Sequence, residues 1–296
     1  MRRQIFIPFF LICLICLPLT AFFVGCGGGG GSGSSDSGDL GTFSLNVTDA
    51  KPVLPENTES VLVTFEEVHV HKAGEGWTTL PLAQEPYTID LLKFQQGKTT
   101  ELVPPVSLEP GKYTQIRIVV SSAQLITDTK AHSLDVPSGN LKTDTQFDFQ
   151  VEGGGAVDIT LDFDLSRSIV VTGQQPPTYK LKPVLHINQT QEAATIRGQI
   201  TENAFVTHDC DEATVTVFWD KDLDGNVDID HSEDEVYTQV VVAGNGPATF
   251  SIFWLVPEQG YIVQFEMDGN NEDPEFEETL SPGDLPAGAV YDLDPY

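Results

Sequence analysis

Residues 157–164 read Val157-Asp158-Ile159-Thr160-Leu161-Asp162-Phe163-Asp164, with apolar and polar side chains in strict alternation. Successive side chains of a β-strand point to opposite faces, so this pattern predicts a half-buried antiparallel strand. The same alternation recurs in residues 43–47, 113–120, 147–151 and 179–187, each bounded by Gly, Pro, Asn or Asp turn residues. No long segment between residues 41 and 188 shows a helical period. Strands at this spacing predict a β-sandwich of immunoglobulin-like or transthyretin-like type over residues 41–190.

A second all-β module is predicted over residues 191–296. Its candidate strands cover residues 194–200, 213–219, 236–242, 248–256 and 261–267. If successive strands alternate in direction, the strands that end at Trp219 and Met267 leave the module at opposite ends. The expected fold class is therefore all-β, with two β-sandwich modules in the chain.

The charge of the chain is strongly negative and unevenly distributed. The 296 residues include 15 basic and 44 acidic side chains, which give a formal net charge of −29. This charge excludes a nucleic-acid-binding protein, and a hydrophobic fraction of 40% argues against general disorder. Residues 191–296 carry 24 acidic side chains against Arg197 and Lys221 as their only basic residues. The second module must therefore tolerate strong self-repulsion or bind cations.

The N-terminus has the composition of an export signal. Met1-Arg2-Arg3-Gln4 is a short basic start, and residues 5–24 are almost continuously apolar. This run is also long enough to cross a bilayer as a retained helix, an alternative that its length leaves open. The sequence predicts a signal peptide over residues 1–25, followed by a flexible Gly/Ser linker that ends at residue 40.

The end of the apolar run carries a lipidation motif. Phe23-Val24-Gly25-Cys26 resembles the lipobox of bacterial lipoproteins, whose cysteine is acylated after cleavage of the signal. The resemblance implies that lipid on Cys26 anchors the protein to a membrane of the cell envelope, and two acyl chains suffice for stable anchoring. In Gram-negative lipoproteins, Gly rather than Asp after this cysteine implies the outer membrane.

The cysteines do not predict a disulfide. Cys13 and Cys16 are lost with the signal peptide and Cys26 is acylated, so Cys210 is the only other cysteine of the chain. Cys210 lies in the run His208-Asp209-Cys210-Asp211-Glu212. The flanking carboxylates disfavour a thiolate, so we expect a loop thiol rather than a nucleophile.

Several stretches of the first module resemble a family of exported bacterial proteins, domain of unknown function 4382. They are Leu45-Asn46-Val47-Thr48-Asp49-Ala50, Glu109-Pro110-Gly111-Lys112-Tyr113-Thr114-Gln115-Ile116-Arg117, Val136-Pro137-Ser138-Gly139, Asp162-Phe163-Asp164 with Ser168-Ile169-Val170, and Tyr179-Lys180-Leu181-Lys182-Pro183-Val184. Together they cover nearly all of residues 41–190. The resemblance implies an exported, anchored β domain, and it supplies no catalytic residues.

The strongest chemical motif follows the predicted strand at residues 213–219. It reads Asp220-Lys221-Asp222-Leu223-Asp224-Gly225-Asn226-Val227-Asp228. Calcium takes about six to eight oxygen ligands, and alternating carboxylates with glycine at the sixth position let a short loop wrap around the ion. The candidate ligands are the side chains of Asp220, Asp222 and Asp224, the carbonyl of Asn226, and Asp228 directly or through water.

The calcium loop departs from the full signature at its twelfth position. This residue is His231 where Glu is expected, and Glu233 or Asp230 could replace it if the loop bulges. Because strands rather than helices flank the loop, it resembles the calcium loops in β-sandwich repeats of bacterial surface adhesins. The alternative is a solvated acidic hairpin. A second acidic loop, residues 268–273, lacks alternating carboxylates and is a weaker candidate for a cation site.

A second metal hypothesis comes from a change of phase in residues 60–71. Apolar side chains occupy odd positions before Glu66 and even positions after Glu67: Val61, Val63, Phe65, Val68 and Val70. A β-bulge at Glu66-Glu67 explains the change. It would place Glu67, His69 and His71 on the face away from the core, where they could hold zinc or copper. The alternative is a set of solvated side chains, since no third histidine is near in sequence.

These observations lead to one main functional hypothesis and two alternatives. The main one is a non-catalytic, lipid-anchored envelope protein whose calcium-stabilised second module binds a protein or glycan partner. The alternatives are a transition-metal-binding envelope protein that uses Glu67, His69 and His71, and a carbohydrate-active enzyme. The sequence has no Gly-x-Ser-x-Gly, His-Glu-x-x-His or Gly-rich phosphate loop. A carboxylate pair for glycoside hydrolysis stays possible among 44 acidic residues, because its spacing depends on the fold.

Overall fold

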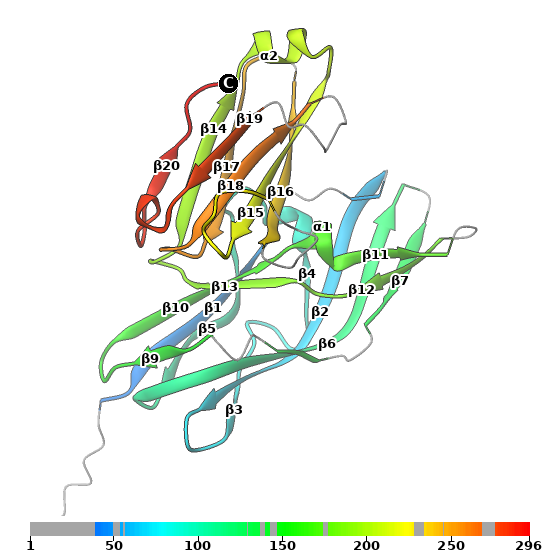
Figure 1. The fold of residues 1–296 in the computed structure, drawn as a ribbon. Coiled ribbons are helices and arrows are strands. Elements are labelled where there is room, and N and C mark those ends of the chain that lie inside the picture. Colours follow the sequence, from blue (N-terminus) through cyan, green and yellow to red (C-terminus); the bar gives the residue numbers. More distant parts are fainter. Residues whose placement is uncertain are drawn as a thin grey trace, which may run out of the picture. The chain divides into compact units, whose positions relative to one another are not determined.

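The computed structural model describes residues 39–49, 54–55, 57–128, 130–136, 140–142, 147–173, 177–227, 234–244, 246–267 and 276–296. These residues are all-β and form two β-sandwiches (Figure 1). In these ranges no helix combines the length and the apolar character needed to cross a membrane. The predicted signal peptide, the predicted lipidation site at Cys26 and nearly all of the predicted linker lie outside the described residues.

The first sandwich is built from two sheets that pair residues far apart in sequence. Its elements are β1 (Gly41–Thr48), β2 (Thr58–Lys72), β3 (Trp77–Leu80), β4 (Tyr87–Asp90), the 3-10 helix η1 (Leu91–Lys93), β5 (Thr100–Leu108), β6 (Gly111–Thr127), β7 (Ala131–Asp135), β8 (Asn140–Lys142), β9 (Phe149–Val151), β10 (Ala156–Phe163), α1 (Leu165–Ser168), β11 (Ile169–Thr172), β12 (Thr178–Leu181) and β13 (Leu185–Gln189). One sheet has the order β13-β10-β1-β5. The other has the order β11-β12-β7-β6-β2-β3, with β4 on β2 and with β8 and β9 on β6. Both sheets contribute to one hydrophobic core.

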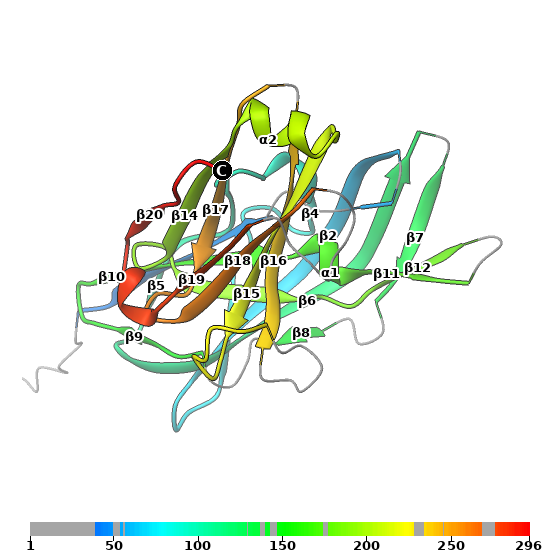
Figure 2. The same ribbon diagram turned by 45° about the horizontal axis from the view of Figure 1, so that its top comes forward.

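The second sandwich is smaller and also has two sheets. Its elements are β14 (Ala194–Ile200), α2 (Glu202–Thr207), β15 (Glu212–Asp220), β16 (Asp234–Ala243), β17 (Ala248–Leu255), β18 (Gly260–Glu266), β19 (Phe276–Leu280), the 3-10 helix η3 (Pro282–Asp284) and β20 (Val290–Asp292). The sheet orders are β17-β14-β20 and β16-β15-β18-β19, and the two layers enclose a separate core (Figure 2). Strands β16 and β17 are edge strands of different sheets.

The positions of the predicted strands are confirmed with one exception, and the expectation that residues 157–164 form a half-buried antiparallel strand is wrong, because β10 is mostly buried and pairs in parallel with β1. The prediction of a single strand over residues 179–187 is wrong, because the chain forms β12 and β13 there and Pro183 lies between them. Proline donates no backbone hydrogen bond to a ladder, and the chain leaves one sheet at this point to enter the other. The predicted bulge in β2 is confirmed, because the register to β6 shifts between Phe65 and Glu67.

The polar face of β10 differs from a solvated strand face. Its pairing with β1 is parallel and its pairing with β13 is antiparallel, so β10 lies inside its sheet. Thr160 is fully buried, and Asp162 and Asp164 are each only 1% exposed. Asp164 caps α1, because its Oδ1 accepts a hydrogen bond from Arg167 N at 3.2 Å. Two carboxylates that alternation placed toward solvent are therefore inside the protein.

Candidate functional site

The candidate calcium loop joins β15 to β16. Strand β15 ends at Asp220, and the antiparallel register places Asp220 opposite Asp234, the first residue of β16. One carboxylate oxygen from each of Asp220, Asp222 and Asp224 lies within 4.8 Å of the others. Asp220 is 2% exposed, whereas Asp222 and Asp224 lie on the surface. The structure thus brings together the three side chains that the spacing singled out.

Backbone N–H groups hold the three carboxylates in a tight turn. Asp220 accepts hydrogen bonds from Leu223 N at 2.7 Å and from Gly225 N at 3.2 Å. Asp222 accepts one from Asp224 N at 3.3 Å, and Asp224 accepts one from Asn226 N at 2.7 Å. Gly225 has φ +79°, a left-handed conformation that costs glycine little. The loop therefore turns tightly around the carboxylates, and Gly225 lies where this turn needs a left-handed backbone conformation.

The charge of the loop is only partly compensated within the described residues. Burial raises the pKa of Asp220, the N–H groups of Leu223 and Gly225 lower it, and the nearby charges of Asp234 and Asp222 raise it again. Hydrogen bonds from Asn226 lower the pKa of Asp224. The ammonium of Lys221, which is next to the trio in sequence, instead lies 2.7 Å from Glu235 Oε2. A bound cation would reduce the repulsion among the acidic side chains.

The other predicted ligands of this site lie partly inside and partly outside the described part of the chain. Asn226 is described and exposed, and its side chain lies at the loop, where Nδ2 donates to Asp224 O at 3.4 Å. Asp228 and Glu233 lie outside the described residues, as does the second acidic loop at 268–273. Strands β15 and β18 are antiparallel, so the prediction that the strands ending near Trp219 and Met267 leave the module at opposite ends is confirmed.

The histidine face of β2 has a different arrangement. His69 Nε2 lies 2.9 Å from Glu67 Oε2, and His69 Nδ1 lies 2.9 Å from Thr79 Oγ1. His71 Nδ1 lies 3.0 Å from Thr114 Oγ1. In the part of the chain that the structure describes, the aspartate trio is the one group of three potential ligand atoms within 4.8 Å. A metal at Glu67, His69 and His71 stays a prediction.

Sequence analysis missed a buried acidic group at the end of β1 and β10. Asp49, Asp162 and Asp164 are each 1% exposed, and burial followed by the charge of Asp162 raises the pKa of Asp49 well above its ordinary range. Burial likewise raises the pKa of Asp164 from 3.8 to about 6. Asp162 and Asp164 are visible in the sequence as polar residues of the alternating run at 157–164. Their burial depends on other segments of the chain, which this run does not reveal.

Comparison with known proteins supports part of this description. Residues 40–183 match the family model described as "Domain of unknown function (DUF4382)". This agrees with the resemblance found in the first module. No curated protein matches the chain.

Three solved structures of Bacteroides proteins show a distant likeness. A "putative adhesin" from Bacteroides ovatus is 9% identical, with 86% of this chain and 87% of that chain covered and a TM-score of 0.25. A "putative adhesin" from Bacteroides ovatus ATCC 8483 is 10% identical, covering 93% and 99%, with a TM-score of 0.19. A "putative cell adhesion protein" from Bacteroides fragilis NCTC 9343 is 12% identical, covering 85% and 91%, with a TM-score of 0.21. Scores of this size do not establish a common fold.

Proposed function

We propose that the protein is a non-catalytic, lipid-anchored protein of the bacterial cell envelope whose second sandwich is stabilised by calcium and binds a protein or glycan partner. The observation that carries the proposal is the convergence of Asp220, Asp222 and Asp224 at the end of β15. The site would be a structural one, which fixes the loop between two strands and leaves the surface around it to contact the partner.

The chemistry of the loop favours calcium. Carboxylate and carbonyl oxygens are its usual ligands, and several waters can complete its coordination. The trio supplies three oxygens, Asn226 offers a carbonyl, and Asp228 and Glu233 follow within reach in sequence. A module with 24 acidic and two basic side chains also attracts divalent cations over its whole surface. The buried carboxylate of Asp220 distinguishes the loop from a purely solvated acidic hairpin.

The anchor is proposed from the sequence at Cys26. Acylation of this residue would hold the chain at the membrane, most simply the outer membrane, and the Gly/Ser linker would let both sandwiches stand away from it. An anchored binding module needs such a spacer to reach a partner. The partner is a protein or a glycan, and nucleic acid is excluded by the charge.

Thermal unfolding of the full chain in calcium and in chelator tests the calcium proposal. A loop of this kind with a Kd on the order of 0.1 mM stabilises the folded state by about 2 kcal/mol at about 5 mM calcium. This corresponds to a rise in Tm of about 4–8 °C. The double variant Asp222→Asn with Asp224→Asn should lose the rise and should melt like the wild type in chelator.

A matched control separates the loop from general charge effects. Asp209→Asn with Asp211→Asn removes the same two charges from exposed positions just before β15, at the other end of that strand. This control should keep the full calcium-dependent rise in Tm. An equal Tm of the wild type in calcium and in chelator would refute the calcium site. An equal loss of the calcium-dependent rise in Tm in both double variants would show that calcium only screens surface charge.

A further inference from the structure

The outer face of the first sandwich gathers aromatic, basic and amide side chains from three neighbouring strands. Strands β3, β2 and β6 lie next to one another in one sheet. The antiparallel register places Trp77 and Gln115 on either side of His71, and Arg117 beside His69. Residues directly opposite each other in a sheet share a face. The neighbours of these residues along β2 and β6 are buried in the core, so the five side chains lie on the face away from it.

An aromatic contact holds Arg117 on this face. Its Cζ lies over the Trp77 ring, 4.0 Å from the ring centre. The ring of His71 also contacts Trp77, with the two centroids 5.0 Å apart and the planes at 61°. A guanidinium over an aromatic ring is attracted by the π-face, and this attraction does not use its N–H groups as hydrogen-bond donors. The arginine is therefore positioned while its donors are still available.

The guanidinium of Arg117 has no acceptor in the part of the chain that the structure describes. Its Nε is buried without a hydrogen-bond partner, and Arg117 forms no ion pair with a described residue although the chain has 44 acidic side chains. The carboxylate of Glu67, on the same face, lies 2.9 Å from His69 Nε2 instead. A buried donor without an acceptor costs free energy. An acceptor with negative charge is therefore what this place lacks.

The surroundings of Arg117 indicate which anion would fit. The planar fork of a guanidinium matches the two oxygens of a carboxylate. Trp77 and Gln115 are both half-buried, so each is in part accessible to a ligand. The tryptophan ring offers a surface for C–H groups, and the glutamine amide can donate hydrogen bonds to hydroxyl groups and accept them. A sugar ring that carries a carboxylate has all three complementary features.

We propose that this face of the first sandwich binds a uronic acid. The carboxylate accepts hydrogen bonds from Arg117, the sugar ring packs on Trp77, and its hydroxyl groups bind the amide of Gln115. An acidic peptide would also supply a carboxylate. However, a peptide main chain binds best to a free strand edge, and β2 and β6 are each paired on both sides. The site does not depend on calcium at the β15–β16 loop.

The net charge of the chain does not prevent binding of one carboxylate. At physiological salt, exposed charges more than about 8 Å apart are largely screened from each other. A single anionic group therefore responds mainly to Arg117, whereas a nucleic acid would meet acidic side chains along its whole length.

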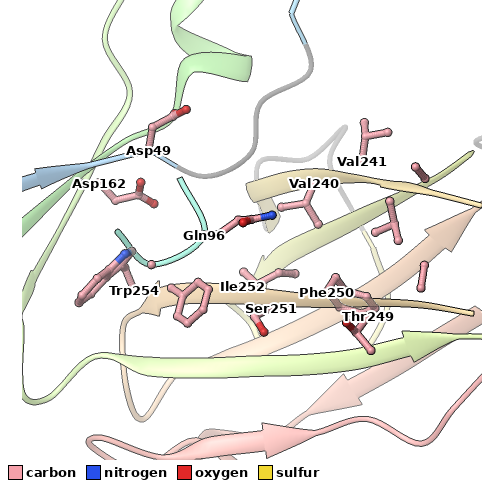
Figure 3. A pocket seen from close by; sticks show the side chains of 15 residues that line it. Asp49, Gln96, Asp162, Val240, Val241, Thr249, Phe250, Ser251, Ile252 and Trp254 are labelled. Carbon is pink, nitrogen blue, oxygen red and sulfur yellow. The ribbon is translucent and has the colours of Figure 1, made fainter. Parts of the chain in front are cut away.

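The pocket between β16 and β17 is a poorer place for the same ligand. It has a volume of about 280 Å³, and Asp49 and Asp162 lie at one end of it (Figure 3). No Lys, Arg or His is among the described residues that line it. A carboxylate placed there would lose hydration without gaining a countercharge.

Calorimetric titration of sodium D-glucuronate into the full chain tests the proposal. The protein is freed of metal ions with a chelator and dialysed into Tris chloride, because phosphate is itself an anion that arginine binds. The detergent is a polyoxyethylene ether, which contains no sugar. For so small a ligand we expect a Kd on the order of 1 mM. Methyl β-D-glucoside, which has a neutral hydroxymethyl group in place of the carboxylate, should bind at least about tenfold more weakly.

Variants of two arginines locate the site. Arg117→Gln should weaken glucuronate binding at least about tenfold. If this variant fails to fold, Arg117→Lys takes its place; it keeps the charge but loses the planar fork, and it should weaken binding at least about threefold. Arg197→Gln is the matched control, because it removes the same charge from an exposed position on β14. The control should bind like the wild type.

Four results would overturn the proposal. They are the absence of glucuronate binding, equal affinity for methyl β-D-glucoside, equal affinity for acetate, and tighter binding of the acidic peptide acetyl-Gly-Glu-Gly-amide. The third would mean a carboxylate site without sugar recognition, and the fourth a protein partner. Binding that appears only after zinc or calcium is added would also refute the role of Arg117, because a metal ion would then hold the carboxylate. Failure of the calcium proposal is seen in thermal unfolding alone and leaves this titration unchanged.

Discussion

Asp164 offers a sharp test of the electrostatics at the end of β10. Its carboxylate is buried and caps α1, and its Oδ2 has no hydrogen-bond partner among the described residues. Burial raises its pKa to about 6, whereas Arg167 N and the charge of Arg167 oppose the rise. In the unfolded chain the ordinary value is 3.8. The folded state therefore holds a proton on Asp164 more tightly than the unfolded state does.

The sign and size of the effect follow from proton linkage. A raised folded pKa gives stability that is fully present below pH 3.8 and is lost as the pH rises through 6. Each pKa unit corresponds to about 1.4 kcal/mol, so ionised Asp164 costs the fold about 3 kcal/mol at pH 8. Asp164→Asn removes this cost and keeps a good N-cap. A buried amide without an acceptor subtracts a constant amount that does not vary with pH.

Urea unfolding of both proteins, followed by far-UV circular dichroism from pH 4 to 8, measures the effect. The free energy of unfolding of Asp164→Asn minus that of the wild type should be about 2.5 kcal/mol larger at pH 8 than at pH 4, with the change centred between pH 4 and 6. Other titrating groups, such as His186, whose pKa burial lowers to about 4, contribute to both proteins and largely cancel. Asp128→Asn, at an exposed position, controls for the chemical change. A difference that does not vary with pH would refute the reasoning.

The remaining predictions concern the anchor, the histidine face and the contact between the sandwiches. Cys26→Ala should abolish metabolic labelling with palmitate and release the protein from the membrane fraction; continued labelling would contradict lipidation at this residue. If Glu67, His69 and His71 bind zinc, His69→Ala with His71→Ala should abolish binding in calorimetry, and absence of binding to the wild type would exclude the site. Glu235→Gln breaks two part-exposed ion pairs, to Arg167 (3.2 Å) and to Lys221 (2.7 Å), so the free energy of unfolding should fall by about 1 kcal/mol or less for each pair. A loss well above the sum for both pairs would show that they are far less solvated than their exposure indicates.

Local pattern alone determined which segments are strands and where the acidic loop begins. Alternation in residues 157–163 predicts β10 because a strand exposes successive side chains to opposite faces, and this holds without knowledge of its neighbours. The phase change in β2 predicts the bulge for the same reason. The spacing of Asp220, Asp222 and Asp224 predicts their convergence, because a tight turn at Gly225 brings alternate residues to one side.

The tertiary structure alone decided which polar side chains are buried. Asp162 has the same sequence environment as the half-buried Asp158, yet it is buried in a group with Asp49 and Asp164 at the ends of β1 and β10. The pairing of Asp220 with Asp234 depends on the register of a hairpin whose connecting loop is long. Pro183 is visible in sequence, but the passage from one sheet to the other appears only when both are in place. Burial and register arise from contacts between segments distant in sequence, so alternation within one segment has no information about them.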